Sequence, residues 1–313
     1  MSSLKLGRLT MGVALALMLA GCDSATGNSS PNSALAIVCT TGQVGDVVRN
    51  IGGPYVRVQT LMGPGVDPHY YTATPSDIRK LKAAEALFYN GLHLEGRMTD
   101  LMKSLARSKP TFAVIDQVLE SEPERLRETP DFAGNYDPHV WFDVSLWARC
   151  AEYVVERLCE LIPEHADTFR QRGDDYIAEL DDLHEWCKLR LAEVPAGQRV
   201  MVTAHDAFGY LGRAYGMEVR GLQGISTEDE ADLKTINRLV NLLVERRVKA
   251  VFVETSVAPK NIQSLIQGSA ARDHTVVIGG QLFSDAMGEA ETPEGTYVGM
   301  IRYNIDTIVE ALQ

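Results

Sequence analysis

The sequence predicts an α/β protein in which one long rigid helix joins two parallel-sheet lobes. Short apolar segments alternate with amphipathic segments in each half of the chain, which is typical of parallel sheets covered by helices. Between the halves, residues 163–195 carry an apolar stripe among many charged residues, which favours a long helix. The length of 313 residues and the hydrophobic content of 45% are sufficient for two lobes.

The N-terminus predicts secretion. Lys5 and Arg8 precede an apolar run, Met11–Ala20, that is too short to span a bilayer, so residues 1–21 are expected to be a signal peptide. The tetrapeptide Leu19-Ala20-Gly21-Cys22 follows, with small residues before the cysteine, and it resembles a bacterial lipoprotein processing site. The resemblance implies a lipid thioether on Cys22 and a membrane anchor. The alternative is an ordinary signal peptide followed by an incidental cysteine.

The mature chain is expected to begin with a flexible tether, residues 22–34, because this segment is rich in Ser, Asn and Gly. In the N-terminal lobe, residues 35–162, we expect strands at Leu35–Cys39, Val56–Leu61, Ala86–Tyr89 and Phe112–Ile115, and helices at Val44–Ile51, Ser76–Ala84 and Glu95–Leu105. In the C-terminal lobe, residues 196–313, we expect strands at Val200–Thr203, Met217–Arg220, Ala250–Val253 and Thr275–Ile278, and helices at Ala207–Tyr215, Glu228–Glu245, Pro259–Gln267 and Thr296–Leu312.

One helix is expected to connect the lobes. Pro163 suits its start, and Pro195 with Gly197 suits its end. A helix of about thirty residues would be about 45 Å long, and a single stiff connection would limit hinge motion. His165 and His184 lie on this segment and are expected to be solvated.

Charge and motif content exclude several functions. The net charge is −12, and removal of Lys5 and Arg8 with the signal leaves 28 basic against 42 acidic residues, a net charge of −14. Such a surface repels nucleic acid. The chain also lacks a glycine-rich phosphate loop of the required spacing.

The cysteines are expected to be buried free thiols. If Cys22 is lipidated, four remain: Cys39, Cys150, Cys159 and Cys187. An even number outside the cytoplasm allows disulfides, but these four form no Cys-x-x-Cys pair. Cys150 and Cys159 are expected to share one helix, where nine positions separate them too far for a bond.

Four residues are candidate metal ligands. His69 and His139 each lie in an Asp-Pro-His triplet, His205 follows a predicted strand, and Asp285 lies in Leu-Phe-Ser-Asp. Neutral imidazoles with a carboxylate suit a borderline divalent metal ion. Ligands of open parallel sheets bind beyond the carboxyl ends of the strands, so two residues from each lobe are expected to meet between the lobes.

Neighbouring acidic residues have other expected roles. Asp67 and Asp137 could form turns or orient an imidazole, and we favour turns. Asp206 is expected to cap the helix that begins near Ala207. Glu254 ends a strand that faces the same side and is a possible pocket residue, although we do not count it as a ligand.

Eight short motifs run along nearly the whole mature chain: Gly65–Tyr70, Thr74–Asp77, Asn90–Leu92, Asp137–Trp141, Thr203–Phe208, Gly224–Glu228, Phe252–Ser256 and Leu282–Asp285. In these motifs and their order, the chain resembles the metal-binding solute-binding proteins of bacterial ABC importers, which take up zinc, manganese or iron and include lipoproteins once called adhesins. The resemblance implies two α/β lobes joined by a rigid helix, with His69, His139, His205 and Asp285 as ligands. It also implies delivery of the metal to a membrane permease with a cytoplasmic ATPase.

The resemblance leaves the transported metal open among Zn²⁺, Mn²⁺ and Fe²⁺. Many zinc-uptake members carry a histidine-rich loop after the first ligand, but residues 70–136 here contain only His93. Some manganese members have a glutamate at the position of His205. Zinc outbinds manganese at almost any such site, so affinity does not identify the cargo. Calcium and magnesium prefer all-oxygen sites.

Metal capture should weaken below about pH 6.5, because the imidazoles must be neutral to bind the ion. Release should require the permease to pull the lobes apart or to disorder a ligand loop. We expect a monomer without enzymatic activity, anchored outside the cytoplasm in the periplasm or at the cell surface. One alternative is a zinc hydrolase with Glu254 or Asp206 as base, but a fourth ligand at Asp285 would close its water position. Another is an adhesin with a structural metal.

Overall fold

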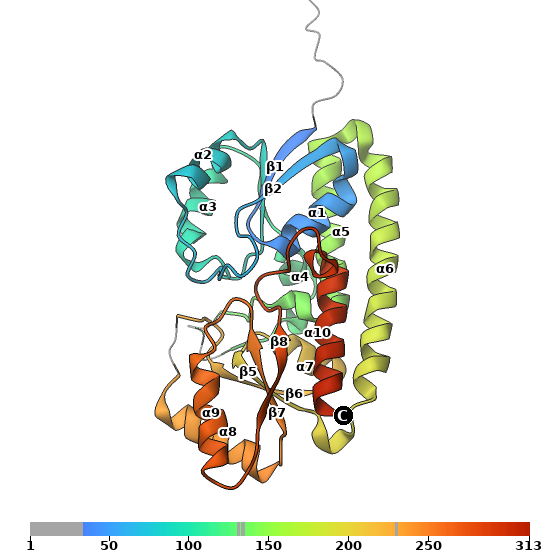
Figure 1. Cartoon of the computed structure of the whole chain (residues 1–313). Coiled ribbons are helices and arrows are strands. Elements are labelled where there is room, and N and C mark those ends of the chain that lie inside the picture. Colours follow the sequence, from blue (N-terminus) through green and yellow to red (C-terminus); the bar gives the residue numbers. More distant parts are fainter. Residues whose placement is uncertain (1–33, 130–131, 133–134, 229–230) are drawn as a thin grey trace, which may run out of the picture. The chain divides into compact units, whose positions relative to one another are not determined.

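Strands and helices alternate in two halves of the chain, as the sequence predicts (Figure 1). The computed structural model describes residues 34–313, except 130–131, 133–134 and 229–230. The predicted signal peptide at 1–21, the lipidated Cys22 and most of the tether at 22–34 lie outside the described residues.

The first half contains a four-stranded parallel sheet of order β2-β1-β3-β4. β1 and β3 match their predicted bounds and β2 ends one residue early, whereas β4 is shifted toward the N-terminus and is shorter than predicted. Its predicted last residues, Val114 and Ile115, form a buried turn instead. The strands are β1 (Leu35–Cys39), β2 (Val56–Thr60), β3 (Ala86–Tyr89) and β4 (Thr111–Ala113).

Three helices of the first half begin at recognisable capping residues, which are Thr41 at α1, Thr74 at α2 and Asp143 at α5. At α2, the Thr74 hydroxyl accepts from the backbone N–H of Asp77, the Asp77 carboxylate accepts from that of Thr74, and Pro75 occupies the first turn. The predicted helix at Glu95–Leu105 is shorter, because a 3₁₀ turn occupies Gly96–Met98, and α4 was not predicted. The helices are α1 (Gly42–Gly52), α2 (Pro75–Ala83), α3 (Thr99–Leu105), α4 (Asp116–Ser121) and α5 (Val144–Leu161).

In the second half, β5 pairs with β6 and β7 with β8, all in parallel, and β5 also contacts β7. β8 continues four residues beyond its predicted end, through Gly279 and Gly280. A Cβ atom at Gly279 would lie 2.7 Å from the Cβ of Ala311, so the glycines allow a helix to pack closely on this strand. The strands are β5 (Val200–His205), β6 (Glu218–Gln223), β7 (Ala250–Glu254) and β8 (Val277–Leu282).

Two helices of this half begin later than predicted. α7 starts at Gly209 with Phe208 as N-cap, so the predicted capping role of Asp206 is wrong. α8 starts at Leu233, and the Asp232 side chain accepts from the backbone N–H of Thr235. The helices are α7 (Gly209–Tyr215), α8 (Leu233–Glu245), α9 (Lys260–Ala270) and α10 (Tyr297–Leu312).

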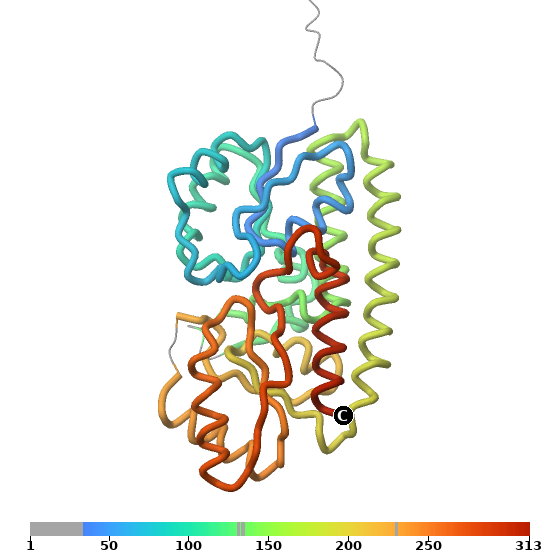
Figure 2. Tube along the Cα trace, in the orientation of Figure 1, coloured from blue at the N-terminus to red at the C-terminus, as the bar shows by residue number. Residues whose placement is uncertain are grey.

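The predicted connecting helix is α6 (Ala166–Ala192), preceded by a 3₁₀ turn at Pro163–His165. Its 27 residues correspond to about 40 Å. The trace of α6 passes α1 and α5 of the first half and α10 of the second half, and it contacts all three (Figure 2). Five apolar side chains of its predicted stripe are buried: Phe169, Tyr176, Leu180, Leu183 and Leu191. Leu189, which the stripe also predicted to pack, is 72% exposed.

The two histidines near this helix are packed, and the expectation that both are solvated is wrong. The His165 ring stacks on Tyr55 with a centroid distance of 3.8 Å. His184 is half-buried, and its Nδ1 lies 3.1 Å from the hydroxyl of Tyr215.

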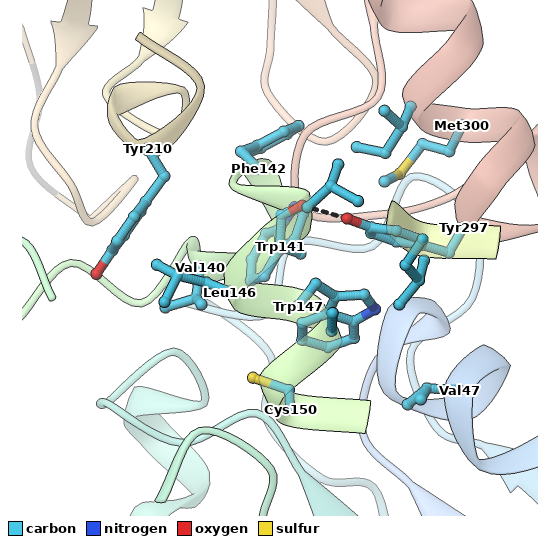
Figure 3. Close-up of a cluster of buried hydrophobic side chains, with 14 of the residues drawn as sticks. Val47, Val140, Trp141, Phe142, Leu146, Trp147, Cys150, Tyr210, Tyr297 and Met300 are labelled. Atoms are coloured by element: carbon cyan, nitrogen blue, oxygen red, sulfur yellow. Dashed lines mark hydrogen bonds between the residues drawn. The ribbon is translucent and has the colours of Figure 1, made fainter. Parts of the chain in front are cut away.

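One apolar core runs through both halves (Figure 3). It joins Val47 of α1, Trp147 and Cys150 of α5, and Met300 of α10. The Tyr297 hydroxyl donates to the carbonyl of Trp141 at 2.7 Å within this core. Because the core belongs to neither half alone, the two halves fold as mutually dependent parts.

The four described cysteines are free thiols, as predicted. Cys39, Cys150 and Cys187 are buried, Cys159 is partly buried, and α5 contains both Cys150 and Cys159. Burial raises the pKa of the Cys39 thiol to about 12, so this residue is a poor source of thiolate for metal binding.

The stripe on α6 gives a stability prediction. Leu183→Ala should lower the free energy of unfolding by about 2–5 kcal/mol, because it opens a cavity in the shared core. Leu189→Ala on the same helix is the control and should change it by less than about 0.5 kcal/mol. Denaturant unfolding monitored by circular dichroism measures both, and equal effects would contradict the assigned core face.

Candidate metal centre

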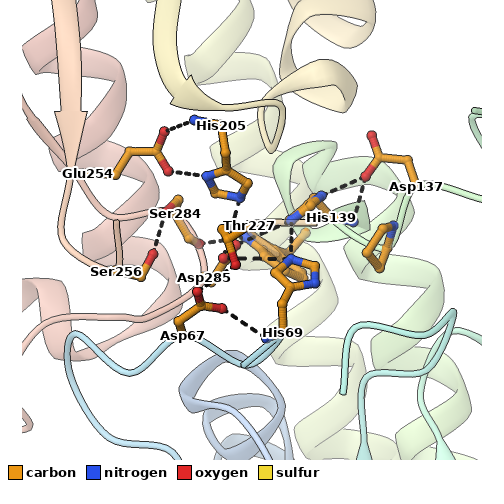
Figure 4. Close-up of polar contacts among 12 residues, drawn as sticks. Asp67, His69, Asp137, His139, His205, Thr227, Glu254, Ser256, Ser284 and Asp285 are labelled. Atoms are coloured by element: carbon orange, nitrogen blue, oxygen red, sulfur yellow. Dashed lines mark hydrogen bonds and ion pairs between the residues drawn. The ribbon is translucent and has the colours of Figure 1, made fainter. Parts of the chain in front are cut away.

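The structure brings together all four predicted ligand side chains (Figure 4). His69 lies in the loop between β2 and α2, and His139 lies just before α5. His205 is the last residue of β5 rather than a loop residue, and Asp285 follows β8 by three positions. One ligand atom from each lies within 4.8 Å of all the others.

The spacing of these atoms fits a first-row metal ion. Asp285 Oδ1 lies 3.3 Å from His139 Nε2, and Asp285 Oδ2 lies 3.4 Å from His205 Nε2. The Nε2 atoms of His69 and His139 are 3.4 Å apart, and His69 Nε2 lies 3.9 Å from Asp285 Oδ2. Four ligands at about 2.0–2.2 Å around a tetrahedral ion would be separated by about 3.3–3.6 Å.

The cluster is buried and carries unsatisfied polar atoms. Each of the four residues is at most 3% exposed. Both carboxylate oxygens of Asp285 and the Nε2 atom of His205 lack a hydrogen-bond partner among the described residues. The three imidazoles are the nearest groups that can carry a positive charge, at 3.3–3.9 Å from Asp285. A buried carboxylate that accepts no hydrogen bond is costly unless a positive charge balances it, so this arrangement favours cation binding.

Asp137 orients His139. Its Oδ1 atom lies 2.7 Å from His139 Nδ1 and also accepts from the backbone N–H of His139 at 3.0 Å. The guanidinium of Arg127 pairs with the other oxygen of Asp137. Because a carboxylate accepts at Nδ1, the Nε2 lone pair is directed at the cluster. Asp137 therefore makes the favoured turn contact and also orients the imidazole, which is the alternative role that the sequence left open.

Glu254 has the same role at His205. Its Oε2 atom lies 2.5 Å from His205 Nδ1, and its Oε1 atom accepts from the backbone N–H of His205 at 2.9 Å. Glu254 ends β7 and His205 ends β5, and these strands are neighbours. The sequence predicted Glu254 only as a possible pocket residue. The signal for its role was that both residues end adjacent parallel strands.

Asp67 acts on the backbone instead of the ring. Its Oδ1 atom accepts from the backbone N–H of His69 at 2.9 Å, as the favoured turn interpretation requires. Its Oδ2 atom accepts from the hydroxyl of Thr227 at 2.6 Å. Thr227 belongs to the second half, so this bond ties the loop of His69 to the loop before α8.

A buried carboxylate that the sequence did not single out, Glu95, organises the loops around the centre. It accepts from the Thr40 hydroxyl and the Asn90 backbone N–H, both at 2.7 Å, and from the Gly91 backbone N–H at 3.3 Å. The Asn90 side chain donates to the carbonyl of Pro138 at 3.1 Å. This network joins the carboxyl ends of β1 and β3 to the segment that carries His139.

The electrostatics divide the histidines into two kinds. Burial lowers the pKa of His69 to about 3. Burial also acts to lower the pKa of His139, but Asp137 and Asp285 outweigh it and raise the pKa to about 9. Glu254 and Asp285 likewise outweigh burial and hold the pKa of His205 well above its usual range. Conversely, His205 and His139 overcome the effect of burial at Asp285 and hold its pKa well below normal.

The fold and this centre define a class: two-lobed α/β binding proteins with a buried candidate transition-metal site. The chain belongs to the family described as zinc-uptake complex component A, periplasmic, whose model matches residues 37–311. It is 43% identical over 295 residues to the manganese-binding lipoprotein MntA of Bacillus subtilis, covering 94% of this chain and 95% of that protein. It is 47% identical over 276 residues to the zinc-binding protein TroA of Treponema pallidum, covering 88% of each. The solved structure of that periplasmic zinc-binding protein superimposes with a TM-score of 0.85 at 45% identity, covering 90% of this chain and 99% of that one.

Removal of a carboxylate beside an imidazole should weaken metal binding. Glu254→Gln and Asp137→Asn should each reduce the affinity for Mn²⁺ and Zn²⁺ by about 10–100-fold, because the amide keeps an acceptor oxygen but loses the negative charge that makes the imidazole a more basic ligand. Glu185→Gln on the exposed face of α6 is the matched control and should leave both affinities unchanged. Titration calorimetry measures the affinities, and unchanged binding by both site variants would contradict the assigned roles.

The raised histidine pKa values predict a pH dependence. In the metal-free protein, His139 keeps its proton up to about pH 9, so an incoming metal ion must displace that proton at neutral pH. The metal affinity should therefore rise as the pH rises from 6.5 to 9. A histidine with an ordinary pKa would instead predict a rise only up to about pH 6.5. Asp137→Asn should move this rise to lower pH. Affinity that is constant between pH 7 and 9 in non-coordinating buffers would exclude proton displacement.

Proposed function

We propose that this protein is the extracytoplasmic solute-binding lipoprotein of an ABC importer, which captures a divalent transition metal and delivers it to a membrane permease. The observation that carries the proposal is the buried cluster of three imidazoles and one carboxylate. Membership of a periplasmic metal-uptake family supports it. The permease, with its cytoplasmic ATPase, is the expected partner of such a protein.

We assign His69, His139, His205 and Asp285 as the metal ligands, supported by their convergence and by the unsatisfied atoms of Asp285. The proposed organisation is a signal peptide at 1–21, a tether at 22–34, an N-terminal lobe at 35–162, a connecting helix at 163–195 and a C-terminal lobe at 196–313. Lipidation at Cys22 would anchor the mature protein, and several relatives are named as lipoproteins. None of the helices in the described residues combines the length and apolar character needed to cross a bilayer.

The proposed cargo is Mn²⁺ or Zn²⁺, with Fe²⁺ as a further candidate from the ligand chemistry. Three imidazoles suit zinc, and a carboxylate with two free oxygens suits the harder manganese ion. One relative of comparable identity is named for manganese and another for zinc. The ligand set therefore suits both metals.

Capture and release follow from the positions of the ligands. The ion exchanges its water for two ligands from each half and displaces the protons that His139 and His205 hold. The coordination shell of four ligands is then buried, so release requires movement of a ligand loop. The loop of His69 is tied to the second half through Asp67 and Thr227, and breaking that bond would free one ligand first.

The two alternative functions are not favoured. A hydrolase needs an open coordination position and a base, but Asp285 closes the shell and both oxygens of Glu254 contact His205. Asp206, the other candidate base, lies 4.0 Å from the guanidinium of Arg127. The family is also a transport family rather than an enzyme family. A purely structural metal in an adhesin would unfold the protein when removed, whereas the shared apolar core here does not include the metal ligands.

Uptake by a deletion strain tests the function. Expression of the full chain in its host strain lacking the gene should restore growth and cellular manganese or zinc under starvation for that metal, whereas Asp285→Ala should not, because one ligand is lost from the centre. Elemental analysis of the purified protein identifies the bound ion. Full restoration by Asp285→Ala, at equal protein level, would contradict the proposed site.

A further inference from the structure

The backbone that carries Asp285 is held by side chains from the other half of the protein. The indole N–H of Trp141 donates to the carbonyl of Ser284 at 3.2 Å. The amide of Gln43, at the start of α1, donates to the same carbonyl at 3.4 Å. Both donors are buried, and Ser284 directly precedes the ligand. The peptide between Ser284 and Asp285 therefore depends on two first-half residues for its hydrogen bonds.

Trp141 is itself rigidly placed between two ligands. It follows His139 by two positions, and its ring meets that imidazole edge-on with a centroid distance of 5.2 Å. Its carbonyl accepts from the hydroxyl of Tyr297 (Figure 3), and the side chain is 1% exposed. One side chain thus connects the segment of His139 to the segment of Asp285.

The second half fixes the same loop from its other side. Asn304 of α10 accepts from the backbone N–H of Phe283 at 2.9 Å and donates to its carbonyl at 2.7 Å. The Ser284 hydroxyl lies 2.8 Å from that of Ser256. The Asp285 carboxylate has no hydrogen bond among the described residues, so its position is determined by the backbone that these contacts hold.

We propose that Trp141 and Gln43 are positioning residues that hold the Asp285 carboxylate against the three imidazoles and so set the preference of the site between manganese and zinc. The proposal rests on the metal-binding function above. Imidazole ligands suit zinc, whereas carboxylate oxygens contribute more to manganese binding. A loosened Ser284 peptide leaves the imidazoles in place and frees the carboxylate, which weakens manganese binding more than zinc binding.

The test compares two buried tryptophans in the purified full chain. Trp141→Phe keeps an aromatic ring and removes the N–H donor, and it should weaken Mn²⁺ binding by about 10-fold or more and Zn²⁺ binding by a smaller factor. Trp147→Phe is the control, because Trp147 is equally buried but stacks on Tyr297 at 5.6 Å. It should lower thermal stability without changing the ratio of the two affinities.

Gln43→Met is the second variant, since it keeps the side-chain length and removes the other donor. It should shift the ratio in the same direction as Trp141→Phe, and it keeps the test decisive if the tryptophan variant does not fold. Equal losses for both metals, unchanged ratios in both variants, or an equal shift in Trp147→Phe would overturn the proposal. If the unaltered protein binds neither metal, the proposed function fails instead, so the two failures are distinguishable.

Discussion

The structure of the metal centre depends on the charge of one buried carboxylate, Asp285. Its two oxygens have no hydrogen-bond partner among the described residues, so a cation must balance them. The carboxylates of Asp137 and Glu254 accept at the Nδ1 atoms of His139 and His205, and the guanidinium of Arg127 pairs with Asp137. Asp67 and Asp206 add further carboxylates near these groups. In the metal-free protein, the protons on His139 and His205 balance part of this negative charge, and a bound divalent cation with neutral imidazoles would take their place.

The location of the apolar core determines which parts can respond to that exchange. Trp147 and Tyr297 pack in a core that continues through both halves and α6, so the backbone of the lobes resists separation. Polar contacts join the loop of His69 and the nearby Arg97 to the second half: they include Thr227 with Asp67, and an exposed ion pair between Arg97 and Glu228 at 2.7 Å. An exposed ion pair of this kind contributes at most about 1 kcal/mol. Because such contacts are weaker than the shared apolar core, we expect movement during capture and release at the loop of His69 rather than at a hinge.

The sequence was sufficient for features that local patterns encode. Alternating apolar segments predicted the two parallel-sheet halves, and the repeated Asp-Pro-His triplet marked two of the converging histidines. It was insufficient where contacts join distant positions. Glu254 and His205 are 49 residues apart and meet only because β5 and β7 are neighbours. The predicted strand Thr275–Ile278 stops before Gly279 and Gly280, although these glycines continue β8 and allow α10 to pack at close range.

The identity of the cargo lies beyond both fold and ligand set. Zinc binds almost any mixed site of this type more tightly than manganese, so a chain that selects manganese must either limit the advantage of zinc or rely on supply. With these four residues as ligands, the donor atoms are three imidazole nitrogens and carboxylate oxygen. Other residues can then change the selectivity only through the mobility of these ligands. Glu254 and Asp137 hold two imidazoles through strong hydrogen bonds, whereas the carboxylate is held indirectly, through the peptide of Ser284. If Trp141 and Gln43 set the preference as proposed, selectivity depends on how firmly the backbone before Asp285 is fixed.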